Sequence, residues 1–282
     1  MARCHVCFRH CEIKEGTLGF CGGRTAENGV VKPFNYGKIT SLALDPIEKK
    51  PLARFFPGSR ILSVGSFGCN LRCPFCQNHD ISWSEAAEQY AKTAETVSPR
   101  ELTEIALKTR DRGNIGIAFT YNEPLIGYEY VRDTAMLAQK ENLKTVLVTN
   151  GTAEISVLDE LSPYIDAMNI DLKGFTDDYY RRVLGGDLGQ VTAFIEEAVK
   201  RCHVELTTLI VPGENDSEEE MRELSSWVSQ FRNPDGGSVP LHISRFFPRF
   251  HMTDRAATDV GRVYRLAEIA RENLPYVYTG NC

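Results

Sequence analysis

The sequence lacks the features of a membrane or secreted protein. No stretch approaches the roughly 18 consecutive apolar residues of a transmembrane helix. The start of the chain, M-A-R-C-H-V-C-F-R-H-C, has no apolar core of a signal peptide. Basic residues are fewer than acidic ones, 32 against 38, so there is no general attraction to nucleic acid or anionic membrane. These absences predict a cytoplasmic protein that binds neither nucleic acid nor membrane.

The nine cysteines are therefore expected to be reduced. In the cytoplasm, closely spaced cysteines are more often metal ligands than disulfides. A chain of 282 residues with 42% hydrophobic side chains is long enough for one large α/β domain with a small appendage. We expect a cysteine-rich, metal-binding extension with a hairpin over residues 1–60, and the large domain over 61–282.

From residue 61 onward, apolar stretches typical of buried strands alternate with helical patterns. The strands are predicted at 61–67, 115–120, 144–149, 166–171, 204–211 and 239–246, with a short one near 276–278. The helices are predicted near 99–111, 126–141, 154–161, 176–184, 188–201, 217–231 and 258–273. Such alternation is typical of a parallel sheet with right-handed crossovers. Six units predict a partial (β/α)6 TIM-like barrel, and a hairpin is expected over 30–44, turning near Tyr36 and Gly37.

Three cysteines follow the first strand of this barrel. Cys69, Cys73 and Cys76 have the spacing C-x3-C-x2-C, which fits three corners of one cubane iron–sulfur cluster. A fully ligated cubane takes four cysteines, so one iron would stay open for another ligand. The alternatives are a zinc site with His79 as fourth ligand and, in a secreted chain, disulfides.

A second group of cysteines lies near the N-terminus. Cys4, Cys7, Cys11 and Cys21 are spaced C-x2-C-x3-C-x9-C, among glycines that suit tight turns around a metal. The segment has little apolar content, so a bound metal would supply its folding free energy. Zinc in four thiolates is the first hypothesis, a second iron–sulfur cluster is the alternative, and free, packed thiols are the third.

Polar residues follow other predicted strands, at the edge where ligands of parallel α/β proteins gather. Asn122 and Glu123, in T-Y-N-E-P, offer acceptors for an ammonium group. Asn150 follows the next strand, in V-T-N-G. Asp171 and Lys173 lie on one face of their strand because strand residues alternate. Such a charged pair is expensive unless it faces a polar cavity.

Weaker candidates share either a place at this edge or a charge that suits an acidic substrate. They are Thr207 and Thr208 as ribose or cation ligands, Arg245, Arg249 and His251 as orienting groups, and Lys49 and Lys50 as anion contacts. Each has a simple structural alternative, because threonine is common in strands and a pair of lysines is usually solvated.

Together these motifs resemble the radical S-adenosylmethionine (SAM) superfamily. G-C-N-L-R-C-P-F-C-Q-N is similar to the cluster loop of activating enzymes for glycyl-radical enzymes, with Phe75 at their aromatic position. T-Y-N-E-P stands at their G-G-E-type motif, V-T-N-G resembles their D-T-N-G with Val148 replacing aspartate, and N-I-D-L-K-G contains their D-L-K. The N-terminal cysteines, D-P-I-E-K-K-P-L and Y-V-Y-T-G-N extend the resemblance to the AmmeMemoRadiSam subgroup, whose members can continue past the position of Cys282.

The resemblance implies a [4Fe-4S] cluster on Cys69, Cys73 and Cys76, with SAM chelated through its amino and carboxylate groups on the open iron. The residues that it implies for SAM binding are Phe75, Asn122, Glu123, Asn150, Asp171, Lys173 and Thr207. A one-electron donor such as flavodoxin or ferredoxin would reduce the cluster. SAM would then be cleaved to methionine and a 5′-deoxyadenosyl radical, which abstracts hydrogen from a substrate that the sequence does not identify.

Three functions remain open on this basis. The first is a radical SAM enzyme acting on an unidentified peptide or small molecule. The second is an activating enzyme that makes a glycyl radical on a partner protein. The third, a non-enzymatic iron–sulfur scaffold or regulator, is disfavoured because a scaffold needs no SAM pocket. The resemblance also implies AMMECR-type or Memo-type proteins, or a glycyl-radical enzyme, as partners.

Overall fold

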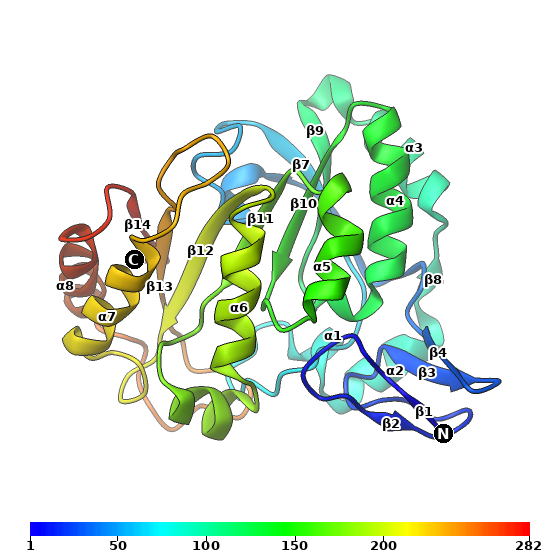
Figure 1. The fold of residues 1–282 in the computed structure, drawn as a ribbon, viewed down its shortest axis with the longest axis horizontal. Coiled ribbons are helices and arrows are strands. Elements are labelled where there is room, and N and C mark those ends of the chain that lie inside the picture. The colour runs from blue at the N-terminus through cyan, green and yellow to red at the C-terminus, as the bar shows by residue number, and fades with distance from the viewer.

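The computed structural model describes residues 1–282, apart from the side chain of Glu88. Its centre is an eight-stranded sheet in the order β14-β13-β12-β11-β10-β9-β7-β6 (Figure 1). The parallel strands are β7 (Arg60–Gly65), β9 (Asn114–Phe119), β10 (Lys144–Thr149), β11 (Ala167–Asp171), β12 (His203–Ile210), β13 (Leu241–Arg245) and β14 (Val277–Gly280). They follow chain order without closing, so the prediction of a partial barrel is confirmed.

Helices cover the outer face of this sheet (Figure 1). They are α3 (Pro99–Leu107), α4 (Tyr128–Lys140), α5 (Ile155–Leu161), α6 (Leu188–Ala198), α7 (Glu218–Val228) and α8 (Val260–Arg271). Residues Tyr179–Leu184 form a π-helix, and short 3-10 turns occupy Ile47–Lys49, Arg110–Arg112, Pro124–Gly127 and Ser162–Tyr164. The start of α3 is the predicted capping box, because Ser98 accepts from the N–H of Glu101 and the Glu101 side chain accepts from Ser98. No helix among the described residues is both long and apolar enough to cross a membrane.

The N-terminal part differs from the prediction. The hairpin is formed by β3 (Arg24–Glu27) and β4 (Val30–Pro33), and not by residues 30–44 turning at Tyr36 and Gly37. Its turn is Asn28–Gly29, both with positive φ (52° and 75°), the pair that a two-residue hairpin turn favours. Beyond it, β5 (Lys38–Ile39) pairs with the distant β8 (Glu95–Thr96).

Residues on both sides of position 60 build the main sheet. β6 (Ser41–Pro46) pairs antiparallel with β7 and forms one edge of that sheet. Residues 1–33, with β1 (Ala2–Arg3) paired to β2 (Glu12–Ile13), stand outside it. The division at residue 60 stays a prediction, and the pairing of β6 with β7 joins residues on its two sides.

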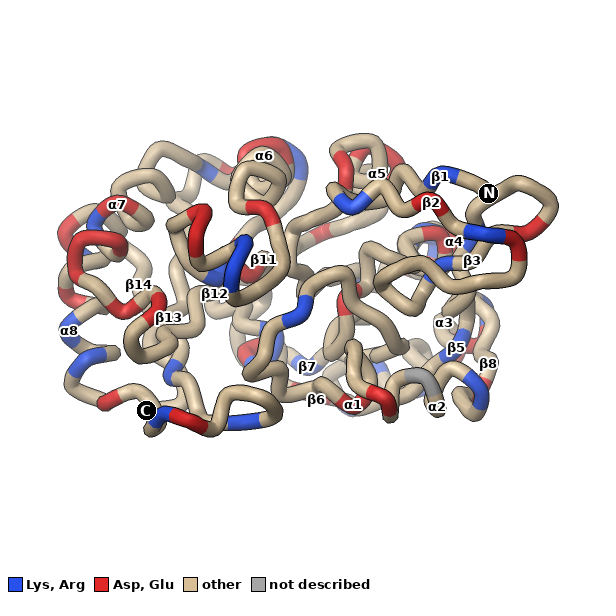
Figure 2. The backbone as a smooth tube through the Cα atoms, turned by 90° about the horizontal axis from the view of Figure 1, so that it is seen from below, with Lys and Arg blue, Asp and Glu red and all other residues tan. Residues whose placement is uncertain are grey.

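The N-terminal segment and the short helices α1 (His79–Ser82) and α2 (Glu85–Thr93) lie together at the end of the sheet toward which the strands point (Figure 1). Val6 accepts a backbone hydrogen bond from Glu154, at the start of α5 after β10. Figure 2 views the molecule from this end and shows acidic and basic residues interspersed along the chain. The N-terminal cysteines are thereby brought to the edge where the sequence predicted the ligand site.

The opposite end of the barrel is filled by the chain itself. Ile47 and Leu52 are fully buried among inward-facing residues of the strands, such as Val146. The carbonyl of Pro51 accepts from the amide of Asn169 (2.9 Å). The loop 47–58 therefore plugs the amino end of the barrel.

Candidate cluster and SAM site

The cysteine loop after β7 is fixed by contacts of its own backbone. Gly68 has φ 94°, and an added Cβ would stand 2.6 Å from the carbonyl oxygen of Cys21, so a side chain would clash here. The Arg72 guanidinium donates to the carbonyl groups of Cys69 and Leu71, both at 2.8 Å. The conformation of the loop is thus set by the chain, and the three cysteines leave it from fixed positions.

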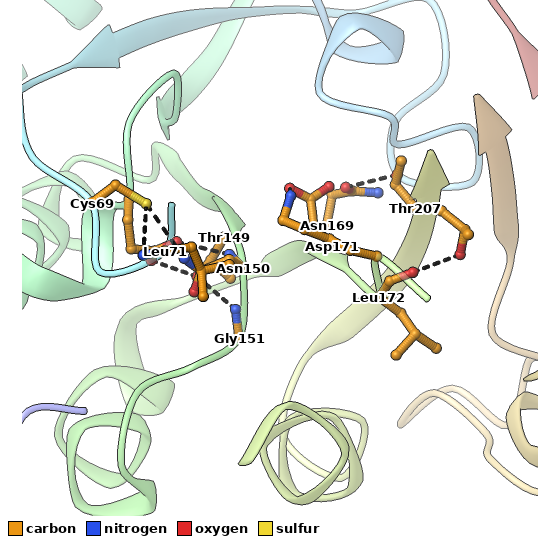
Figure 3. Close-up of polar contacts among 12 residues, drawn as sticks. Cys69, Leu71, Thr149, Asn150, Gly151, Asn169, Asp171, Leu172 and Thr207 are labelled. Atoms are coloured by element: carbon orange, nitrogen blue, oxygen red, sulfur yellow. Dashed lines mark hydrogen bonds and ion pairs between the residues drawn. The ribbon is translucent and has the colours of Figure 1, made fainter. Parts of the chain in front are cut away.

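The thiols of this loop suit an anionic cluster. Cys73 is buried, Cys69 and Cys76 are half-buried, and none is in a disulfide. Burial raises the pKa of all three, that of Cys73 to about 11, so the free thiols are neutral and a metal is needed to hold thiolates. The N–H of Leu71 (3.4 Å) and the amide of Asn150 (3.7 Å) donate to the sulfur of Cys69 (Figure 3). Such donors stabilise an iron-bound thiolate. The residues of this loop therefore suit an iron–sulfur cluster.

Zinc fits this loop poorly. Among the described residues, no three His, Cys, Asp or Glu side chains are arranged around a single metal ion. The candidate fourth ligand His79 is instead stacked on Phe250, with ring centroids 4.3 Å apart, and contacts Asp80 through Nδ1 (3.0 Å). In a cubane each thiolate binds a different iron, so the sulfurs need not converge on one point.

Asn122 and Glu123 connect the end of β9 to its neighbours. Asn122 accepts from the N–H of Ser66 (2.9 Å) and donates to the carbonyls of Phe67 and Gly68, both at 3.2 Å, so it holds the start of the cysteine loop. Its role in the described contacts is to position that loop. A direct contact from Asn122 to SAM stays a prediction.

Glu123 is a buried carboxylate, 3% exposed. It accepts from the hydroxyl of Thr149 (2.6 Å), the N–H of Asn150 (2.8 Å) and the N–H of Leu125 (3.0 Å). Burial raises its pKa to about 7, because the hydrogen bonds only partly offset the loss of solvation. Among the described residues, the negative charge of Glu123 is therefore not balanced by a cation, although both carboxylate oxygens accept hydrogen bonds.

Asn150 joins the turn after β10 to the cysteine loop. Besides the contact with Cys69, its amide donates to the side chain of Asn70 (3.0 Å), and its oxygen accepts from the hydroxyl of Thr152 (2.6 Å). Asn70 in turn donates to Thr152 (2.6 Å). Asn70 and Thr149 were not singled out in the sequence. Asn70 stands inside the cysteine motif, but its partner is distant in the chain.

Asp171 and Lys173 form an ion pair of 2.8 Å at the end of β11. Burial disfavours the ammonium, but Asp171 and Cys73 hold the pKa of Lys173 well above its usual value. The backbone of Lys173 is fixed on both sides, because its N–H donates to the hydroxyl of Tyr180 (3.0 Å) and its carbonyl accepts from Asn215 (2.6 Å). A fixed ammonium thus lies within electrostatic reach of a cluster cysteine.

Figure 3 shows these groups in two sets, with Cys69, Thr149 and Asn150 on one side and Asp171 and Thr207 on the other. The hydroxyl of Thr207 donates to Asn169 (2.9 Å). That of Thr208 donates to the carbonyl of Leu172 (2.7 Å). Both threonines are thus engaged within the sheet, and ligand contacts from them stay a prediction.

The two lysines of the plug loop differ. Lys49 is 68% exposed at its side chain, whereas Lys50 is 3% exposed and pairs with Asp45 at 3.1 Å. Tyr121, in the left-handed conformation with φ 73°, donates to the same carboxylate (2.8 Å). The solvated alternative therefore holds for Lys49 and is wrong for Lys50, whose charge is neutralised inside the protein.

The segment after β13 closes over the cysteine loop. Phe246 packs edge-on against Phe75, with ring centroids 6.0 Å apart. The N–H of His251 donates to the carbonyl of Pro74 (2.8 Å), and Phe250 packs on Trp83. We name residues 246–252 the strap.

The strap explains the positions of the remaining candidates. Arg245 uses its Nε to hold the carbonyl of Thr258 (2.7 Å), and Arg249 pairs through its backbone with Met252. His251 lies on the strap beside Trp83. Phe75, predicted to contact SAM, is 7% exposed beneath the strap.

Residues 63–225, more than half of the chain, match the sequence profile of the radical SAM superfamily. The chain belongs to the radical SAM superfamily. Membership implies a [4Fe-4S] cluster and SAM, and the predicted enzyme family is confirmed.

Relatives of this radical SAM enzyme include activating enzymes. It is 40% identical over 281 residues to the uncharacterized protein MJ0808 of Methanocaldococcus jannaschii, covering 99% of this chain and 81% of that one. It is 28% identical over 182 residues to the pyruvate formate-lyase-activating enzyme of Clostridium pasteurianum, covering 63% of this chain and 72% of that one. The predicted relationship to activating enzymes is thereby confirmed.

Solved structures share the fold. Streptococcus suis SuiB matches with a TM-score of 0.58 at 15% identity, over 77% of this chain and 48% of that chain, so this chain spans about half of SuiB. A radical SAM methyltransferase from Sphaerobacter thermophilus matches with a TM-score of 0.58 at 17% identity, over 80% of this chain and 67% of that one. At these identities the likeness concerns the fold alone.

Proposed function

We propose that this radical SAM enzyme holds a [4Fe-4S] cluster on Cys69, Cys73 and Cys76 and cleaves SAM to abstract hydrogen from a substrate. The observation that carries this proposal is the convergence of three free thiols, a buried carboxylate and a half-buried ammonium at one end of the barrel. When bound, the cluster and SAM supply a one-electron cleavage to methionine and a 5′-deoxyadenosyl radical, which takes a hydrogen atom.

The charges of the site suit the methionyl part of SAM, which carries an ammonium, a sulfonium and a carboxylate. The unbalanced negative charge of Glu123 favours cationic groups nearby. Among the described residues, the Lys173 ammonium makes one hydrogen bond, to Asp171, so further N–H donors are available for a carboxylate. Asn150 contributes by holding the β10 turn against Cys69.

The surroundings of the site favour exclusion of water. The strap covers the cysteine loop from one side, and the plug loop closes the opposite end of the barrel. A dry cavity protects a reactive radical from side reactions.

A second candidate function is glycyl-radical generation on a partner protein. The similarity to pyruvate formate-lyase-activating enzymes favours it. The strap counts against it, since a protein loop that entered beside Phe75 would have to displace Phe246. A flavodoxin-type or ferredoxin-type donor, an AMMECR-type or Memo-type partner and a cytoplasmic location stay predictions.

The test is anaerobic reconstitution followed by reduction with dithionite in the presence of SAM. We expect equal amounts of methionine and 5′-deoxyadenosine from the wild type and neither from Cys73→Ala. Cys202→Ala is the matched control, because Cys202 is a buried free cysteine bonded to the carbonyl of Ala198, away from the site. SAM cleavage by Cys73→Ala at the wild-type rate would refute the proposal.

Deuterium transfer distinguishes the two candidate functions. Reduced enzyme and SAM are incubated with extracts of cells grown on deuterated glycine, and label is followed into 5′-deoxyadenosine. Label, together with a protein-borne radical doublet in electron paramagnetic resonance, would select glycyl-radical generation. Turnover on small-molecule fractions without label would exclude it.

A further inference from the structure

The four N-terminal cysteines share one cavity. Cys4, Cys7, Cys11 and Cys21 all line it, and none forms a disulfide. They are brought together by short backbone contacts, such as the N–H of Cys4 donating to the carbonyl of Cys11 (2.9 Å). Four free thiols around one cavity form a ligand set for either a zinc ion or an iron–sulfur cluster.

The cavity also contains a buried cation with an unused donor. Arg24 is 4% exposed and donates through its terminal nitrogens to Glu129 (2.9 and 2.7 Å) and to the carbonyl of Ile126 (3.0 Å). Its Nε has no hydrogen-bond partner among the described residues. Arg24 and Arg9 both line the cavity. A buried donor beside four thiols fits an anionic group with sulfur acceptors, and such donors tune the reduction potential of a cluster.

The cavity adjoins the loop of the radical SAM cluster. The carbonyl of Cys21 accepts from the N–H of Cys69 (3.1 Å). Asn70, the next residue, lines the cavity and is bonded to Asn150 (3.0 Å) on the other side. Arg9 holds the carbonyl of Asn70 at 2.7 Å. A structural zinc ion does not require contact with the radical SAM cysteine loop, whereas a cluster that passes electrons to that loop does.

The outer side of the cavity is accessible. Cys11 and Cys21 are half-buried. Beside them Phe20 is 42% exposed and lies between the guanidinium groups of Arg9 (3.5 Å) and Arg72 (3.8 Å). An apolar ring flanked by two cations suits contact with an acidic electron-transfer protein.

We propose that Cys4, Cys7, Cys11 and Cys21 hold a second iron–sulfur cluster that passes electrons to the radical SAM cluster. One electron leaves an acidic, low-potential donor protein and reduces the N-terminal cluster. The same electron then moves to the cluster on Cys69, Cys73 and Cys76, and the N-terminal cluster returns to its oxidised state. The relay rests on the proposed function, whereas the presence of the second cluster does not.

The presence of this cluster is tested in the triple variant Cys69→Ala, Cys73→Ala, Cys76→Ala. After anaerobic reconstitution we expect iron and acid-labile sulfide in equal amounts, with a Mössbauer spectrum of a cluster. Adding Cys11→Ser and Cys21→Ser, at the two half-buried positions, should remove both. Zinc without sulfide, or no metal, in the folded triple variant would overturn the proposal. Should the variants not fold, Mössbauer spectroscopy of the wild type gives the answer: two kinds of cluster are expected, and a single kind would overturn the proposal.

The relay is tested by stopped-flow reduction of the Cys11→Ser variant. With reduced flavodoxin as donor, we expect reduction of the radical SAM cluster to slow at least tenfold, while dithionite still supports SAM cleavage. An unchanged rate with flavodoxin would overturn the relay. A wild type that contains both clusters but cleaves no SAM with dithionite would refute the proposed function and the relay, and would leave the second cluster standing.

Discussion

Glu123 and Glu205 are buried carboxylates at opposite ends of the same sheet, Glu123 in the loop after β9 and Glu205 within β12. Glu205, near the amino end of β12, is bonded to the ring nitrogens of His203 (3.0 Å) and His242 (2.7 Å) and to two backbone N–H groups of the plug loop. Burial raises its pKa, but these contacts outweigh burial and lower it to about 2.

Glu123, directly after β9, has only neutral donors, and burial raises its pKa to about 7. The difference shows that burial alone does not decide the protonation state of a carboxylate. The number and kind of its hydrogen-bond partners decide it as well. At the amino end the protein satisfies its own charges and gains stability. At the carboxyl end it keeps charge unbalanced, which suits a ligand.

The largest effect on folding is expected from Glu205→Ala. The substitution leaves two histidines and the N–H groups of Ala53 and Arg54 without their acceptor. Breaking a buried charged network in this way costs about 3–5 kcal/mol. Urea unfolding of the unliganded protein measures the loss, and SAM affinity of the folded fraction should stay unchanged. Weakened SAM binding with normal stability would contradict the assignment of this end to stability.

The largest effect on binding is expected from Lys173→Ala. Loss of a charge-assisted hydrogen bond costs about 1.5–3 kcal/mol, roughly a 10- to 100-fold loss of SAM affinity. Equilibrium dialysis of the reconstituted protein with labelled SAM measures it. Lys49→Ala is the matched control, because Lys49 is exposed and lies on the plug loop. Equal affinities of the two variants would remove Lys173 from the site.

Glu123→Gln tests a smaller change. The amide oxygen can keep two of the three donors, but the amide nitrogen would then face the N–H of Asn150. We expect a loss of about 1–3 kcal/mol in stability and weaker SAM binding, because the negative charge is gone. If affinity for SAM rose, the charge of Glu123 would be a burden and not an aid to binding.

The smallest effects are expected in the pH dependence of stability. The contributions of Glu205 and Glu123 to the free energy of unfolding change in opposite directions as pH rises. The lowered pKa of Glu205 gives stability that is present above its unfolded value near 4.5 and lost as pH falls toward about 2. The raised pKa of Glu123 gives stability that is present below 4.5 and lost as pH rises through about 7. Denaturation across pH 2–8 should show the acid-side slope reduced in Glu205→Gln and the neutral-side slope reduced in Glu123→Gln. Unaltered slopes in both variants would contradict the comparison.

Features carried by local sequence were predictable. The apolar strands, the capping box at Ser98 and the cysteine spacing each depend on neighbouring residues, and the structure contains the predicted strands and cap. The hairpin lies earlier in the chain than predicted, because the turn forms at Asn28–Gly29, where both residues have positive φ.

Features that depend on distant pairing were not predictable. The pairing of β5 with β8 joins residues more than 50 positions apart. The burial of Lys50 against Asp45 and the closure of the strap on Phe75 likewise arise only in the folded chain. The site was found through its motifs, while the contacts that hold it, such as Asn70 with Asn150, required the structure.

The most direct test of the central claim is electron–nuclear double resonance of the reduced protein with SAM labelled by ¹⁵N at its amino group. If the iron that Cys69, Cys73 and Cys76 leave open binds SAM, the cluster signal will show coupling to ¹⁵N in the wild type. The coupling will persist in Cys202→Ala. A reduced cluster whose signal is the same with labelled and unlabelled SAM would contradict the account.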